Sequence, residues 1–509
     1  MVQTPTKLTP AGIYNEYQKG VSYNQSIELY DKVRKNENFF VGNQWEGVDA
    51  PDLDKPVFNI LKRVCNMFIS QIVSDDISVS TSMFTYRPDG ERAMKILSKE
   101  IERAIEYSRA KQKNRRILRN ACVDGDGCLY AYFNPGKKTP GQSGGLIELE
   151  IIDNTNIIFD NTASADVQSQ GHIILAMRKK ISEVVAEARR NGIDEKLISE
   201  IKPDSESELD DERDDCVSVL IRFWKENGSV HCSKSTKDIF IKEPFDTKLS
   251  LYPVAFMNWE GVKNSYHGQA VVTELLPNQI FVNKCYAMGM DYVKKMAFPK
   301  LIYDKNRFPN GFSNKIGEAV KIEGGVNDAI ATAFKMPDMS SAVMELVEKT
   351  MVYTKEYMGA TDATLGNIRP DNAAAIIATQ KASNAPLELI RQSFYQFVED
   401  YVRIFADIMR AYYGVRQVSV EEGQIEMFDF STLGIYDMNI DVNVGASAYW
   451  SDIVQVQTAD SLFAHGIIKD PEIYLNSIPD SYIKNKQKII SQIRNEKEKN
   501  GGVILNENI

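Results

Sequence analysis

The amino-acid sequence predicts an α+β fold, in which helices and strands occupy separate stretches of the chain. Apolar residues recur at helical spacing through residues 12–122. Between about 128 and 260 the period changes to two, and apolar and polar residues alternate in short runs. From Gly268 the pattern is helical again, and its most regular stripe lies in 373–413. Blocks of helices and strands that follow one another, rather than alternate one by one, are typical of this class.

Three helices are expected in the N-terminal part of the chain. The first covers 12–42 and ends near Gly42, because glycine readily adopts the left-handed conformation that stops a helix. The second covers 57–74 and the third 90–122, each with one apolar face. The other face of the third helix is rich in Arg and Lys, which indicates a solvated surface.

The strand-rich block begins with the alternating run at 129–133. Further strands are expected at 146–152, 156–160, 172–178, 217–224, 230–233, 238–241 and 252–259, with one short helix at 181–201. Residues 204–215 contain eight acidic residues and one Arg. This composition predicts a solvated loop between two of the strands.

The second half of the chain is mostly helical. Residues 268–298 are apolar almost all round, so this helix needs neighbours on every side, and Pro277 should kink it or start its main part. Residues 299–338 read as short strands and turns, and 339–358 as a returning helix. A turn-rich loop precedes the helix at 373–413, which is about 60 Å long at 1.5 Å per residue. Strands at 415–420, 424–429 and 438–445 and two or three helices from about 450 to 499 complete the chain.

Composition excludes several classes of protein. The chain has 509 residues, 43% of them apolar, which is ordinary for a globular protein of two to four domains. Its formal net charge of −10 makes tight non-specific DNA binding by the isolated chain unexpected. No apolar run reaches about 18 residues, so no membrane span is expected, and the N-terminus lacks the pattern of a signal peptide. Six cysteines without a CxxC pair indicate reduced thiols in a cytosolic compartment.

No arrangement of residues indicates catalysis, a cofactor or a metal site. The four histidines are not at metal-ligand spacing, and the sequence contains neither a phosphate-binding loop nor a nucleophile elbow. The run Asp124-Gly125-Asp126-Gly127 resembles part of a calcium loop, but Cys122 and Phe133 stand where that loop needs its first and last carboxylates. It is therefore interpreted as a helix stop and a turn into the following strand.

Four phrases together resemble the portal proteins, or head–tail connectors, of tailed double-stranded-DNA bacteriophages. The resemblance covers residues from about 30 to 415. The order and spacing of the four phrases make it more specific than any one of them does alone. The first is Phe40-Val41-Gly42-Asn43-Gln44-Trp45 with the following helix start at Asn59, and the second is the helix–turn–strand at 120–133. The third is Tyr266-His267-Gly268-Gln269-Ala270 followed by Leu275, Gln279 and Asn283, although Gln269 and Ala270 replace the more usual small hydroxyl residue. The fourth is the glycine-bounded run from Met358 to Gly366.

The resemblance implies a portal-like subunit with a helical stem, a small α/β clip, a strand-rich wing and a helical crown. The domains then become 1–127, an N-terminal helical part of the wing; 128–265, the strand-rich wing; 266–298, the first stem helix; 299–338, the clip; 339–358, the second stem helix; 359–372, the channel loop; 373–449, the long wing helix with its returning strands; and 450–509, the crown and tail.

The resemblance also implies partners and contact residues. A ring of about twelve copies at one capsid vertex, in the virion and before that in the host cytoplasm, would pass double-stranded DNA without sequence specificity. Its partners would be the terminase large subunit, the head–tail adaptor, the major capsid protein and the scaffold. The implied channel-loop residues are Gly359, Thr361, Asp362, Leu365, Gly366 and Arg369, and the implied clip residues that dock the motor or adaptor are Arg307, Phe308, Asn310 and Phe312. Lys294, Lys295 and Lys300 are candidates for brief contacts with phosphates.

Two alternatives stay open at this stage. One is another ring-forming viral structural protein or a secretion channel, which a DNA-wide channel and a clip-like protrusion would separate from a portal. The other is a metal-dependent nuclease, for which carboxylates are plentiful but no spacing singles out a pair. For each of the three lysines the alternative role is an ordinary solvated charge, and for Arg369 it is a salt bridge or a helix-cap contact.

Overall fold

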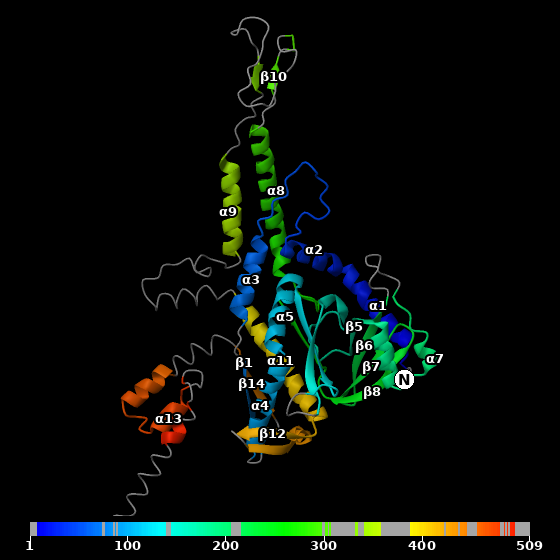
Figure 1. Cartoon of the computed structure of the whole chain (residues 1–509), viewed down its shortest axis with the longest axis vertical. Coiled ribbons are helices and arrows are strands. Elements are labelled where there is room, and N and C mark those ends of the chain that lie inside the picture. The colour runs from blue at the N-terminus through cyan, green and yellow to red at the C-terminus, as the bar shows by residue number, and fades with distance from the viewer. Residues whose placement is uncertain are drawn as a thin grey trace, which may run out of the picture.

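The computed structural model describes residues 8–73, 77–84, 87, 90–138, 144–204, 215–297, 301–303, 305–306, 331–333, 341–357, 387–421, 424–435, 438–444, 456–478, 483, 486 and 489–493. Helices and antiparallel strands are segregated along the chain, which confirms the α+β class. In Figure 1 a mixed body carries a long helical hairpin that projects away from it.

Five helices form the N-terminal part: α1 (Pro10–Ser26), α2 (Leu29–Val41), α3 (Ile60–Ile72), α4 (Gly90–Tyr107) and α5 (Ala110–Asp124). The predicted single helices at 12–42 and 90–122 were therefore wrong, because each is broken near its middle. The breaks lie at Glu28 and Arg109, whose φ angles of 58° and 54° are left-handed. Neither residue is a glycine, so the apolar period runs across the break without a stop signal.

Two antiparallel sheets follow. The smaller has the order β3-β2-β9, with β2 (Asp126–Asn134) between β3 (Leu146–Ile152) and β9 (Val254–Asn258). The larger has the order β4-β5-β6-β7-β8, built from Ile157–Phe159, His172–Lys180, Cys216–Glu226, Ser229–Ser235 and Phe240–Leu249. The 3-10 turn η1 (Asn154–Asn156) links β3 to β4. The predicted helix at 181–201 is two short helices, α6 (Ile181–Arg190) and α7 (Glu195–Ile198).

Helix α11 (Glu388–Tyr412) is the central support of the body. It packs against β9, β2, β8 and α4, and its buried aromatic residues Phe394, Phe397, Tyr401 and Phe405 follow the predicted stripe. The rest of the predicted helix, 373–386, lies outside the described residues. One continuous apolar core joins α11, both sheets and helices α3, α4 and α5, and a small second cluster lies under α1.

Two-stranded pairings complete the body. β12 (Val415–Glu421) pairs with β13 (Gln424–Asp429), the 3-10 segment η5 (Phe430–Ile435) follows, and β14 (Met438–Val444) pairs with β1 (Ile77–Met83). Strand β1 was missed from the sequence, although Ile77, Val79 and Met83 alternate with three serines in the period-two pattern of a strand. Helix α13 (Pro471–Asn476) belongs to the C-terminal part, where 456–464 are also helical.

The projecting hairpin consists of α8 (Val271–Ala297) and α9 (Ser341–Tyr357). Strands β10 (Leu301–Tyr303) and β11 (Ala331–Ala333) pair at its tip, as Figure 1 shows. Pro277 lies inside α8, near its start. Among the described helices, none is both long enough and apolar enough to cross a membrane.

Candidate functional site: the stem hairpin and its root

The stem is defined here as α8 and α9, which lie side by side with opposite directions. Near its base, Asn278 Nδ2 donates to Thr354 Oγ1 at 3.1 Å, and Val347, two turns farther toward the tip, is buried. Higher up, Tyr286 Oη lies 3.9 Å from the Met351 sulfur. The two helices therefore hold each other along their facing sides, and beyond the root, where α8 packs against α2, α3 and α5, their other faces are open.

Those other faces are unusually apolar for a surface. Met288 is 59% exposed and Val293 60% exposed on α8, while Leu346 and Tyr353 are 53% and 60% exposed on α9. The sequence led us to expect neighbours on every side of α8, and the single chain provides them only on some sides. Exposed apolar side chains gathered on one protruding element are typical of a surface that contacts another molecule.

The root of the stem is held by a chain of buried amide side chains that we call the root network: Gln44, Asn59, Gln279 and Asn283. Gln279 Nε2 donates to Asn283 Oδ1 at 2.9 Å, and Asn283 Nδ2 donates to Gln44 Oε1 at 2.6 Å. Gln279, Asn283 and Gln44 are 1%, 3% and 6% exposed. Residues from two segments more than 200 positions apart are thus joined by directional bonds.

Backbone groups of the N-terminal helices complete the root network. Gln279 Oε1 accepts from the Ile60 N–H at 3.0 Å, and its Nε2 also donates to Phe58 O at 2.8 Å. Asn59 caps α3 by accepting from the Lys62 N–H at 3.0 Å and donates to the last turn of α2. The network therefore fixes the start of α3 and the end of α2 against the same two turns of α8.

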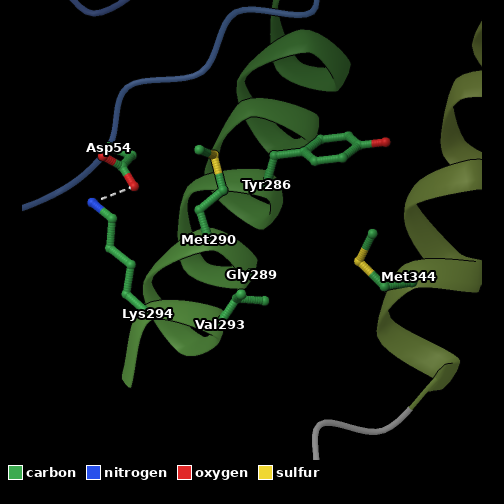
Figure 2. Close-up of a pocket in the computed structure, with 7 residues that line it drawn as sticks. All are labelled: Asp54, Tyr286, Gly289, Met290, Val293, Lys294 and Met344. Atoms are coloured by element: carbon green, nitrogen blue, oxygen red, sulfur yellow. Dashed lines mark ion pairs between the residues drawn. The ribbon is translucent and has the colours of Figure 1, made fainter. Parts of the chain in front are cut away.

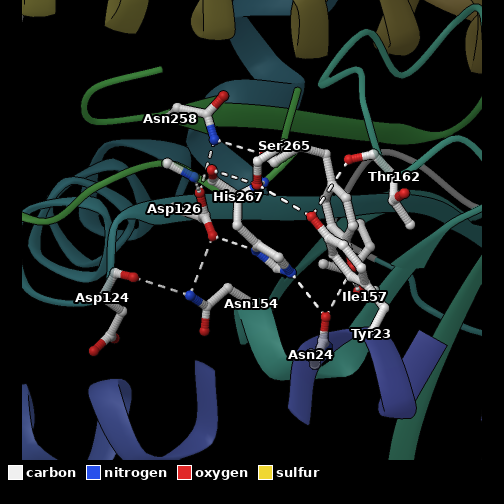
Figure 3. Close-up of polar contacts among 12 residues, drawn as sticks. Tyr23, Asn24, Asp124, Asp126, Asn154, Ile157, Thr162, Asn258, Ser265 and His267 are labelled. Atoms are coloured by element: carbon white, nitrogen blue, oxygen red, sulfur yellow. Dashed lines mark hydrogen bonds and ion pairs between the residues drawn. The ribbon is translucent and has the colours of Figure 1, made fainter. Parts of the chain in front are cut away.

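A second polar cluster joins the stem to the sheets, and we call it the junction cluster: Asn24, Asp126, Asn154, Asn258 and His267 (Figure 3). The Asp126 side chain is fully buried at the start of β2. Its Oδ2 lies 2.7 Å from His267 Nδ1 and accepts from Asn154 Nδ2 at 3.2 Å. Its Oδ1 accepts from Asn258 Nδ2 and from the Gly268 N–H, both at 2.7 Å.

His267 and Tyr266 place this cluster directly before α8. His267 is 3% exposed, and its Nε2 lies 3.1 Å from Asn24 Oδ1 on α1. Tyr266 is fully buried, and its hydroxyl donates to Ile157 O at 3.2 Å. Because a carboxylate only accepts hydrogen bonds, His267 Nδ1 carries a proton toward Asp126. The arrangement holds a structural joint and leaves no ring nitrogen of His267 open to solvent.

Asp124, at the end of α5, lies beside the junction cluster, and the pKa of its carboxyl is strongly shifted. Burial raises its pKa to about 7, while Arg119 lowers the pKa and the Glu37, Asp153 and Asp126 carboxylates raise it further. Its Oδ1 is buried and finds no hydrogen-bond partner in the described part of the chain. The folded state therefore favours the neutral acid.

We expect Asp124→Asn to stabilise the protein at pH 8 by about 1–2 kcal/mol and to change little at pH 4. The unfolded carboxyl ionises near pH 4 and the folded one near pH 7, so wild-type stability falls as the pH rises between these values. Urea unfolding at both pH values measures the difference. Asp49→Asn is the control, because Asp49 is exposed and is not among the groups that shift the pKa of Asp124. An Asp124→Asn effect that does not depend on pH would contradict this assignment.

An apolar pocket of about 390 Å³ lies on one side of the stem, as Figure 2 shows. Its walls are α8, α9 and the loop that contains Asp54. Lys294 closes one edge through an ion pair with Asp54 at 2.6 Å. The lining residues are Asp54, Tyr286, Gly289, Met290, Val293, Lys294 and Met344.

The structure places only two of the residues predicted to act in function. Lys294 pairs with Asp54, and Lys295 pairs with Asp291 at 2.6 Å; both lysines are exposed near the outer end of α8. Lys300, the clip residues Arg307, Phe308, Asn310 and Phe312, and the channel-loop residues Gly359, Thr361, Asp362, Leu365, Gly366 and Arg369 lie outside the described residues. Within the described part of the chain, no three His, Cys, Asp or Glu side chains are grouped to hold a metal ion.

The sequence motifs that resemble portals contain several residues of the root network, but they predict no role for these side chains. The first motif contains Gln44 and Asn59, and the third contains Gln279 and Asn283. The structure joins the two motifs through hydrogen bonds. Asp126 was interpreted only as part of a turn, although it receives four hydrogen bonds. A polar residue that interrupts an apolar run, as Gln279 and Asn283 do, was the available signal of a buried network.

Comparison with known proteins adds no relative. No model of a known protein family matches the chain, and no curated protein matches it. What can be said of its function therefore rests on the stem, its root and the sequence phrases that meet there.

Proposed function

We propose that this chain is a subunit of a bacteriophage portal: a ring at one capsid vertex through which double-stranded DNA enters and leaves. The observation that carries the proposal is the stem, a long two-helix hairpin with exposed apolar faces and a small strand pair at its tip. Side-by-side packing of such hairpins around an axis would cover those faces and line a channel with helices.

The root network supports the same proposal. Three of the four phrases that resemble portals reach the stem root: Gln44 and Asn59 from the first, the turn with Asp126 from the second, and His267, Gln279 and Asn283 from the third. A stem that carries neighbours and passing DNA must keep a fixed angle to its body. Directional buried hydrogen bonds provide this better than apolar contacts do.

The net charge suits a channel for DNA. With a formal charge of −10 per chain, a ring would repel phosphates and let DNA slide with little adhesion. Lys294 and Lys295, near the outer end of the stem, would make brief contacts with phosphates, although each already has an acidic partner. Packaging needs an energy source, which in this proposal is a separate terminase ATPase that docks at the tip together with the head–tail adaptor.

The test is to determine the mass and shape of the purified full-length protein. Light scattering and negative-stain electron microscopy should find closed rings of about twelve copies around a channel wide enough for a DNA duplex. Co-expression with the capsid and scaffold proteins repeats the test under assembly conditions. A compact dimer that cleaves DNA only with a divalent metal ion would overturn the proposal in favour of a nuclease.

A further inference from the structure

The two open sides of α8 have different shapes. One side carries a ridge, defined as Phe281, Lys284 and Met288, all exposed. The other side carries a groove, defined as Tyr286, Gly289, Met290 and Val293 together with Met344 of α9. At about 100° per residue the centres of the two sets lie roughly 155° apart around the helix. The stem therefore has a convex apolar side and, opposite to it, a concave apolar side.

Gly289 makes the groove deep at its middle. A Cβ atom added to Gly289 would meet nothing within 4 Å, so the space above this residue is open. Figure 2 shows Tyr286 and Val293 on the same helix as Gly289, with Met344 across from them on α9. The apolar surface of the groove is exposed to water in the single chain, and its burial under an apolar side chain would be favourable.

The two sides also differ in charge. Lys284 lies between Phe281 and Met288 on the ridge, and Glu348 lies one turn from Met344 on the groove side of α9. Both are exposed, and neither has an ion-pair partner among the described residues. Three other stem lysines are already paired within one chain: Lys294 with Asp54, Lys295 with Asp291, and Lys349 with Glu345.

We propose that the groove binds the ridge of a second copy of this chain, with Met288 of one copy over Gly289 of the next and Lys284 facing Glu348. The proposal deepens the proposed function and rests on its ring. In a ring with cyclic symmetry, equivalent residues lie at the same height along the axis. Met288 and Gly289 are one residue apart, about 1.5 Å along α8, so equal height brings the ridge to the deepest part of the groove.

The contact joins unlike surfaces, which decides the kind of assembly. A ridge that meets a groove leaves a free groove on one copy and a free ridge on the other, so binding continues from copy to copy. Such a contact closes into a ring when the rotation between neighbours closes, and otherwise continues as a helical filament. A two-fold dimer would instead place ridge against ridge or groove against groove, because the two lie on opposite sides of α8. Burial of Met288 and Phe281 supplies the stability, and the pair of Lys284 and Glu348 selects the register.

Filling the groove tests the apolar part. Gly289→Leu should abolish rings at concentrations where the wild-type chain forms them. Its subunit should keep the wild-type circular dichroism and melt no earlier, because the site is open and leucine favours a helix more than glycine does. Rings of Gly289→Leu that assemble as the wild type does would overturn the inference while leaving the portal proposal intact.

Charge reversal tests the register. Lys284→Glu and Glu348→Lys should each raise the concentration needed for half-maximal ring assembly by about fivefold or more, and the double variant should restore it. Lys284→Glu combined with Glu356→Lys is the matched control, because Glu356 is exposed on the same helix two turns away. Rescue by Glu356→Lys, or no rescue by Glu348→Lys, overturns the inference. A wild-type chain that forms no ring even with its capsid partners overturns the proposed function as well.

Discussion

Asp126→Ala is expected to lower the free energy of unfolding by about 3–5 kcal/mol, the range for removing one member of a buried pair. The substitution removes both acceptor atoms of the junction cluster at once. His267 Nδ1 and the Gly268 N–H would lose their partner, and the Asn258 and Asn154 amides would each lose one of two acceptors. The site is buried, since Tyr266 and His267 are almost inaccessible to solvent, so water cannot easily replace the carboxylate.

Asp126→Asn separates charge from shape. It keeps one acceptor oxygen and places an NH2 group where the other oxygen accepts hydrogen bonds, so its effect should fall between those of the wild type and Asp126→Ala. Asp153→Ala, an exposed acid in the same segment of the chain, is the control and should change stability by less than about 0.5 kcal/mol. Urea unfolding measures all three variants.

Hydrogen exchange shows where the damage occurs. The Gly268 amide and the first turn of α8 should exchange faster in Asp126→Ala, while the sheet β4–β8 keeps its protection until global unfolding. If Asp126→Ala costs no more than Asp153→Ala, the junction cluster does not hold the stem to the sheets.

The sequence predicts the fold class and most elements, because local periodicity reports them. The stripe of α11 and the alternation of β2 are visible without any partner, since each buries one face along its own length. The breaks at Glu28 and Arg109 are not visible, because left-handed residues there leave the apolar period undisturbed. Strand β1 has a visible period-two alternation, but its partner β14, more than 350 positions away, is not predictable from that pattern.

The candidate site was predictable only in its residue types. Gln44 and Asn283 are polar residues that a sequence reading places on a surface, and their burial depends on a contact across 239 positions. Lys294 and Lys295 were predicted to contact DNA from charge and position, and only the structure places an acid beside each. Burial and pairing are tertiary properties, so they follow from neither composition nor period.

The stem is therefore anchored by two different kinds of contact. Apolar burial of Val271, Val272 and Leu275 attaches the first turns of α8 to the core without fixing their direction. The root network and the junction cluster add bonds with defined geometry on either side of those turns. Loss of the polar bonds should leave α8 attached to the core but let the angle between the stem and the body vary. Substitutions at the root can therefore separate the stability of the fold from the orientation of the stem.

Gln279→Ala tests this separation, and we expect it to lower the free energy of unfolding by about 3 kcal/mol. Asn283 Oδ1 would lose its donor, Phe58 O would lose one of two donors, and the Ile60 N–H would lose one of two acceptors. Asn278→Ala is the matched control, since Asn278 is the adjacent residue and makes a single bond to Thr354. It should cost about 1 kcal/mol, and urea unfolding compares the two.

A double-mutant cycle with Gln44→Ala then asks whether the root network acts as a unit. Among the described bonds, the shortest path between Gln44 and Gln279 runs through Asn283, and a longer one passes through Phe39 O and Asn59. If the chain of bonds is cooperative, removal of either end already loosens Asn283, and the double variant should cost at least about 0.5 kcal/mol less than the sum of the single ones. Additive costs would mean that each amide stabilises its own helix separately. In that case the angle of the stem would be set by apolar packing, and hydrogen exchange at Ile60 would stay as slow in Gln44→Ala as in the wild type.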